Sequence, residues 1–148
     1  MHDLIKRLAP KNGARVGLAA CLVFLVGAPL MAWGAGASMQ WALAGAAGLS
    51  ALAWAGVRFG GAVANYIVAT ALIGQAMLVT ALLAGHPWQV DAHLIFFLML
   101  AIVAFCGQIA VVFWACALIA AHHLVLGFVM PEWVYPDADS VDNLARTG

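Results

Sequence analysis

The sequence predicts an all-α polytopic membrane protein, a bundle of about five transmembrane helices. The first observation behind this fold class is composition. Of the 148 residues, 66% are hydrophobic and only 8% are charged, and the mean hydropathy is +1.03. Soluble domains carry roughly 25% charged residues, so a chain this poor in charge could not cover a water-facing surface.

The second observation is that the charged residues leave long gaps in which apolar helices fit. No charged residue occurs within 16–57, 59–90 or 92–131. A bilayer core of roughly 30 Å needs about 20 residues of helix, so the first and third gaps each hold two spans and the second gap holds one. The predicted spans are about 15–34, 39–58, 62–84, 92–106 and 109–130.

The chain also marks the ends of these spans. The small residues at 34–38 separate the first two spans, Pro87 bars a smooth continuation after the third, and Gly107-Gln108 is the break between the last two. The apolar run 16–33 is longer than the roughly 7–15 residues of a signal-peptide core. A retained first helix is therefore expected.

The third observation is the placement of lysine and arginine, which gives an orientation. Lys6, Arg7, Lys11 and Arg15 precede the first span, and Arg58 lies between the second and third. By the positive-inside rule the N-terminus is cytoplasmic, and five spans place the C-terminus outside. The chain then divides into a cytoplasmic segment 1–14, a helical sensor or binding domain 15–131, and an extracytoplasmic tail 132–148. Net charge is zero and no basic run exists, so no nucleic-acid partner is expected.

Ionisable side chains gather on the predicted outer side of this bundle. His86 follows the third span, Asp91 and His93 open the fourth, and the pair His122-His123 lies in the fifth. Ionisable groups inside a membrane are costly, and by default they indicate a functional site. Imidazole with carboxylate suits Zn²⁺, Cu²⁺ or Fe²⁺, and the affinity order among divalent ions favours copper. The sequence therefore predicts a transition-metal site, with copper or zinc favoured.

The expected ligands are Asp91, His93 and one or both of His122 and His123, with His86 peripheral. Adjacent His122 and His123 point about 100° apart on a helix, so one is expected to face into the bundle and the other to orient it. Four further side chains are candidates to line the cavity or to support the ligands: Gln75, Met77, Trp88 and Gln89.

Simpler interpretations remain open for several of these residues. Asp91 would serve equally as a helix cap, and His86 as a solvated loop residue. Gln75 would serve as a helix–helix hydrogen-bonding group, and Met77 as packing. The histidines also allow haem b as an alternative, because histidines on facing helices can ligate haem iron axially, here His93 with His122 or His123. A third possibility is a non-catalytic accessory membrane subunit. An enzyme is not expected, because no general base or substrate pocket can be argued.

At these positions the sequence resembles the membrane-embedded N-terminal sensor region of bacterial methyl-accepting chemotaxis proteins. More distantly, it resembles the sensor region of membrane diguanylate cyclases. The likeness covers about residues 60–136 and is most specific at Trp-Gln-x-Asp-x-His (88–93) and at His122-His123. Two features depart from the family: residues 106–109 are Cys-Gly-Gln-Ile where an acidic residue, Trp and Arg are usual, and Gly127 stands where Asn is common.

The resemblance implies a multi-pass protein of the bacterial inner membrane that couples binding to helix rearrangement for chemotaxis-type signalling. Family members continue into another membrane helix and a cytoplasmic signalling domain, so this sequence would be either a sensor fragment or a stand-alone relative. The partners implied are membrane lipid, a metal ion, and either further copies of the chain or a cytoplasmic signalling domain.

Overall fold

The computed structural model describes residues 13–105 and 108–135, and every regular element in these ranges is a helix. This confirms the all-α class. The elements are α2 (Gly13–Gly34), α3 (Met39–Phe59), α4 (Gly61–Leu82), α5 (Gln89–Ala92), α6 (Leu94–Phe105), α7 (Ile109–Val129) and the 3-10 turn η1 (Pro131–Trp133). Within the described residues, four helices are long and apolar enough to cross a membrane, namely α2, α3, α4 and α7.

The helix in the region of the predicted fourth span is shorter than the others. α6 has 12 residues, which at 1.5 Å per residue is about 18 Å, well below a bilayer core of roughly 30 Å. Together with α5 it forms one apolar stretch, Gln89–Phe105, interrupted at His93. The number of membrane spans and the orientation of the termini therefore stay predictions. The segment before Gly13, the expected break at Gly107 and the tail after Tyr135 lie outside the described residues.

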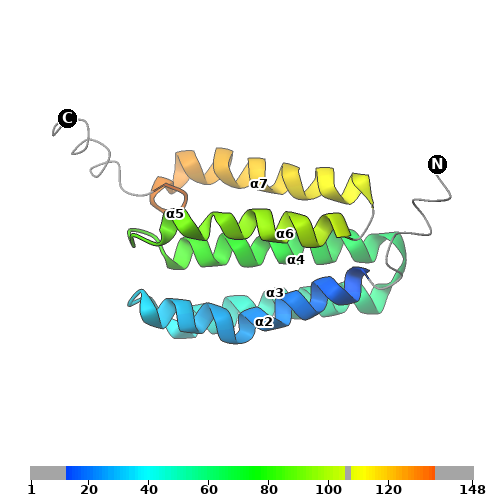
Figure 1. The fold of residues 1–148 in the computed structure, drawn as a ribbon, viewed down its shortest axis with the longest axis horizontal. Coiled ribbons are helices and arrows are strands. Elements are labelled where there is room, and N and C mark those ends of the chain that lie inside the picture. The colour runs from blue at the N-terminus through cyan, green and yellow to red at the C-terminus, as the bar shows by residue number, and fades with distance from the viewer. Residues whose placement is uncertain (1–12, 106–107, 136–148) are drawn as a thin grey trace.

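The long helices lie side by side along one axis, and α4 is central among them (Figure 1). It contacts α2 and α3 on one side and α6 and α7 on the other. Half of its most apolar window is buried (50%), against 17% for α7. Large apolar side chains elsewhere face outward, with Phe97, Phe113 and Phe128 70%, 72% and 84% exposed. An outer surface of this kind suits a membrane protein.

Glycines bring α3 and α4 close together. A Cβ added at Gly56 would lie 2.9 Å from Cβ of Ile67, and one added at Gly74 would lie 2.6 Å from Cδ2 of Leu49. Each helix thus presents a glycine to a branched side chain of the other. Small residues are what allow such approach between helices in lipid, where packing replaces the hydrophobic effect as the attraction.

A buried set of hydrogen bonds also ties α2, α3 and α4. The Gln75 amide nitrogen donates to the Ala46 carbonyl at 3.1 Å and to Ser50 Oγ at 3.5 Å, and Ser50 Oγ donates to the Cys21 carbonyl at 3.1 Å. Gln75 therefore makes an interhelical contact toward α3, which was one of its two sequence interpretations. Met77 is half-buried and packs against the main hydrophobic core.

Gly56 is the position where added bulk is least tolerable, because the atom it would meet is the Cβ of Ile67, which cannot swing away. Gly56→Leu should destabilise the protein by about 1–3 kcal/mol, as overpacking does, and lower its melting temperature in detergent by several degrees. Gly48→Leu on the same helix is the matched control, because nothing lies within 4 Å of that position. Thermal unfolding followed by circular dichroism measures both. Equal melting temperatures for the two variants would contradict the α3–α4 packing.

Candidate functional site

Three histidines meet at the end of the bundle where α4 ends, α6 begins and α7 ends. The rings of His93 and His123 are 5.8 Å apart between centroids and nearly parallel, at 28°. The rings of His122 and His123 are 5.3 Å apart, edge to face. Phe96 lies among all three, with centroid distances of 5.5 to 6.1 Å. The structure therefore brings together His93 and both members of the α7 pair.

His93 is positioned by an irregularity in the backbone between α5 and α6. Its backbone N–H donates to the Val90 carbonyl at 3.1 Å instead of to the Gln89 carbonyl four residues back. Its ring Nδ1 takes that place, 2.8 Å from the Gln89 carbonyl oxygen. Because a carbonyl only accepts, this contact requires a proton on Nδ1. A protonated Nδ1 held by a backbone carbonyl is also how many metal-binding histidines are oriented.

His122 and His123 differ in burial, as neighbours on a helix should. His122 is 5% exposed, and its Nε2 is buried without a hydrogen-bond partner among the described residues. His123 is half-buried and lies beside Tyr135, with ring centroids 6.4 Å apart. An unpaired buried ring nitrogen costs free energy, so the His122 Nε2 is the atom at this site that most needs a partner.

Hydrogen bonds of the Gln89 side chain connect the loop after α4 to the segment after α7. Its side chain is fully buried. Its amide nitrogen donates to the Glu132 carbonyl at 2.9 Å, and its amide oxygen accepts from the Gly85 N–H at 3.2 Å. Its backbone carbonyl also holds His93. Gln89 therefore contacts the His93 ring through its backbone carbonyl and connects the two segments that flank the histidines.

Asp91 does not lie with the histidines. It is exposed and lines a separate hollow of about 380 Å³, on the side of the chain that faces α2. That hollow is lined by Met31, Leu83, Trp88, Asp91, Ala92 and Ile95. The reason is helical geometry: residues two apart in a helix point roughly 200° away from each other. Asp91 as a ligand alongside His93 therefore stays a prediction.

His86 is also apart from the cluster. It lies in the loop after α4, where its Nδ1 accepts from the Trp88 backbone N–H at 3.2 Å. Its ring packs edge to face against that of Trp88, with centroids 4.9 Å apart. His86 and Trp88 therefore contact each other within the loop. Trp88 also lines the hollow that Asp91 lines.

The histidine cluster has the chemistry of a metal site, though not its finished geometry. An ion about 2.1 Å from an imidazole nitrogen lies about 3.2 Å from the ring centroid, so two rings on one tetrahedral ion have centroids roughly 5 Å apart. The observed 5.3 Å and 5.8 Å are close to this. Within 13–105 and 108–135, however, no three His, Cys, Asp or Glu side chains are arranged to hold one ion. The rings would have to rotate to converge.

Haem b fits this arrangement less well. Axial histidines point their nitrogens at one iron from opposite faces of a flat porphyrin. His93 and His123 instead lie nearly face to face, and the ring of Phe96 lies 6.0 Å and 6.1 Å from theirs. A porphyrin would have to displace these contacts, whereas a single ion requires only ring rotation.

Comparison with protein-family models, with curated proteins and with solved structures gave no match. The resemblance to chemotaxis sensor regions therefore stays a prediction.

Two residues of the site had no place in the sequence prediction. Phe96 is three residues after His93, on the same face of α6, so helical spacing was the signal for it. Tyr135 had no comparable signal, because its position depends on how the chain turns back after α7. Its ring packs against Gly127, where an added Cβ would lie 3.2 Å from Tyr135 Cε2.

Replacing Gln89 should increase local opening of the segments that it connects, residues 85–93 and 131–135, without unfolding the bundle. Gln89→Leu leaves the Glu132 carbonyl and the Gly85 N–H without their partner, at a cost of about 1–3 kcal/mol. We expect faster amide hydrogen exchange in residues 131–135 and 85–93, with α2 and α3 unchanged. Gln40→Leu makes the same change at an exposed position of α3 and should leave exchange as it is. Unaltered exchange at 131–135 in Gln89→Leu would contradict this role.

Proposed function

We propose that this chain is a membrane sensory module that binds a transition-metal ion, copper or zinc, through His93, His122 and His123. Three imidazoles from two separate parts of the chain support the proposal, since His93 lies between α5 and α6 and the other two lie on α7. Imidazole is a ligand that both metals favour. Asp91 is left out of this set because it lines a different hollow.

The single observation that carries the proposal is the buried, unpartnered Nε2 of His122. A neutral imidazole in a membrane helix normally hydrogen-bonds a neighbour. This one lies instead against another imidazole and an aromatic ring, neither of which is shown to accept its proton or donate to it. An ion would satisfy it, and the His93 ring, held at Nδ1 by the Gln89 carbonyl, would offer Nε2 as a second ligand.

A bound ion would supply a directional link between the beginning of α6 and α7. Holding these two elements together can bias the bundle only if the ion binds one arrangement more tightly than another. We propose that this bias is the signal. The site would lie toward the outer face of a bacterial inner membrane, with the N-terminus cytoplasmic. The partner would be a second copy or a cytoplasmic signalling domain, as the resemblance implies, and no catalytic step is proposed.

The test is a metal titration of the detergent-purified protein after treatment with chelator. The wild-type chain should bind about one Cu²⁺ or Zn²⁺ with a dissociation constant in the micromolar range or below, and His93→Ala and His122→Ala should each weaken binding at least tenfold, about 1.4 kcal/mol. Calorimetry with each metal measures the affinity and the stoichiometry.

Two other residues at this end of the bundle provide control substitutions for the titration. Asp91→Asn and His86→Ala change a carboxylate and an imidazole at the same end of the bundle without touching the three rings. Both should bind metal as the wild type does. Loss of binding in Asp91→Asn would show that the carboxylate joins the site and that the all-histidine set is wrong. Binding unaffected by His93→Ala and His122→Ala would overturn the proposal.

A further inference from the structure

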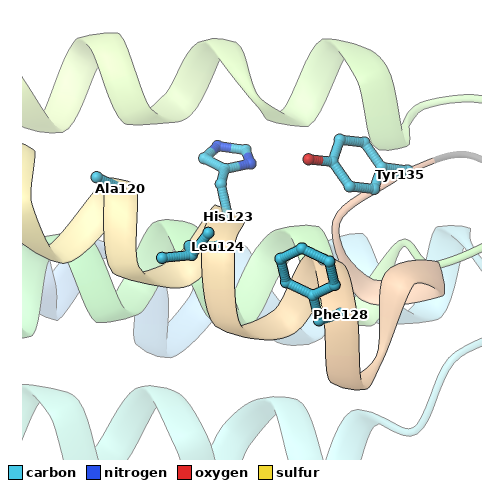
Figure 2. A pocket seen from close by; sticks show the side chains of 6 residues that line it. Ala120, His123, Leu124, Phe128 and Tyr135 are labelled. Carbon is cyan, nitrogen blue, oxygen red and sulfur yellow. The ribbon is translucent and has the colours of Figure 1, made fainter.

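A hollow of about 520 Å³ opens beside α7 at the same end of the molecule (Figure 2). It is lined by Ala120, His123, Leu124, Gly127, Phe128 and Tyr135. Ala120 and Gly127 are seven residues apart and so lie on one face of α7. The small side chain of Ala120 and the absence of one at Gly127 leave space beside the helix. Gly127 also allows the Tyr135 ring to pack against the helix.

The hollow is apolar except for two groups that lie together. Figure 2 shows the Tyr135 hydroxyl directed toward the His123 ring across the hollow, and the two ring centroids are 6.4 Å apart. A phenol carries an O–H donor, and a neutral imidazole carries one N–H donor. The remaining walls are methyl, isobutyl and phenyl groups.

The hollow faces the surface that lipid covers in a membrane helix. Leu124 and Phe128 on its rim are 64% and 84% exposed. A ligand would therefore reach it from the membrane. The distribution of charge indicates which kind of lipid-soluble ligand fits. Within the described ranges the only lysine or arginine residues are Arg15 and Arg58. They lie near the start of α2 and the end of α3, at the opposite end of the bundle. An anionic headgroup would find no counter-charge there.

We infer that this hollow binds a neutral, lipid-soluble molecule whose flat ring carries carbonyl oxygens, a molecule of the quinone class. Its carbonyls would accept from Tyr135 and His123, and its ring would pack against the aromatic side chains of Tyr135 and Phe128. The volume lies within the roughly 300–1,000 Å³ of small-molecule sites, which are mostly apolar with a few polar groups that fix orientation. The hollow shares His123 with the proposed metal site but not His93 or His122, and the inference requires no bound ion.

The probe is ubiquinone-1, titrated into the full chain in lipid nanodiscs after chelator treatment, with binding followed by tryptophan fluorescence. We expect saturable binding near one molecule per chain. Tyr135→Phe should weaken it about fivefold, the effect of losing one hydrogen bond, and Ala120→Phe should weaken it at least tenfold by filling the hollow, about 1.4 kcal/mol. Ala121→Phe adds the same ring at an exposed neighbouring position of α7 that does not line the hollow, and should leave binding unchanged.

The outcomes separate this site from the metal proposal. His93→Ala should keep quinone binding, and Tyr135→Phe should keep metal binding. Quenching that never saturates, or is equal in all variants, would mean partition into lipid and would overturn the inference. Binding lost in Ala120→Phe but kept in Tyr135→Phe would show an apolar ligand site without carbonyl recognition, and would overturn the quinone assignment. If Ala120→Phe fails to fold, Tyr135→Phe decides alone.

Discussion

Buried polar groups in this bundle must find their partners inside the protein, because lipid offers none. Most of the structure at the histidine end follows from that constraint. Gln89 uses both ends of its amide, and the His93 ring takes the carbonyl that its own backbone N–H leaves free. Among the described residues, two buried side-chain atoms lack a partner, Gln75 Oε1 and His122 Nε2. Gln75 still makes two hydrogen bonds through its nitrogen. The His122 ring, whose Nε2 is unpartnered, lies beside the His123 ring. This combination is the reason for proposing a bound ion there.

The histidine site and the hollow beside Tyr135 share one structural origin. α6 begins only at Leu94, after the break at His93, and α7 packs against α4, α6 and η1. The chain then turns back through η1, and Glu132 is fixed to Gln89. This return brings Tyr135 over Gly127 and next to His123. A regular helix in place of the break at His93 would remove the shift in backbone hydrogen bonding that orients the His93 ring.

Much of this could be predicted from the sequence. The apolar runs between sparse charged residues predicted an all-α chain with long membrane-compatible helices. Such a prediction is possible because helices that face lipid are strongly enriched in apolar residues. The sequence also placed His93, His122 and His123 at the same end of the bundle, because the order of the predicted spans puts the start of the fourth and the end of the fifth on one side. The sequence does not show that residues 89–92 form the helical turn α5, which directs positions two apart to opposite sides and places Asp91 in a different hollow. Tyr135 was missed because its place depends on a tertiary contact with Gly127, for which the sequence carries no periodic signal.

We propose above that the imidazoles of His93, before α6, and of His122 and His123, on α7, bind one ion. The most direct test is the X-ray absorption spectrum of the wild-type chain loaded with one equivalent of copper or zinc. If the proposal is right, we expect two to three imidazole nitrogens in the first shell at about 2.0–2.1 Å, with the multiple-scattering pattern of histidine rings. A first shell made of water and carboxylate oxygens, with no imidazole scattering, would contradict it.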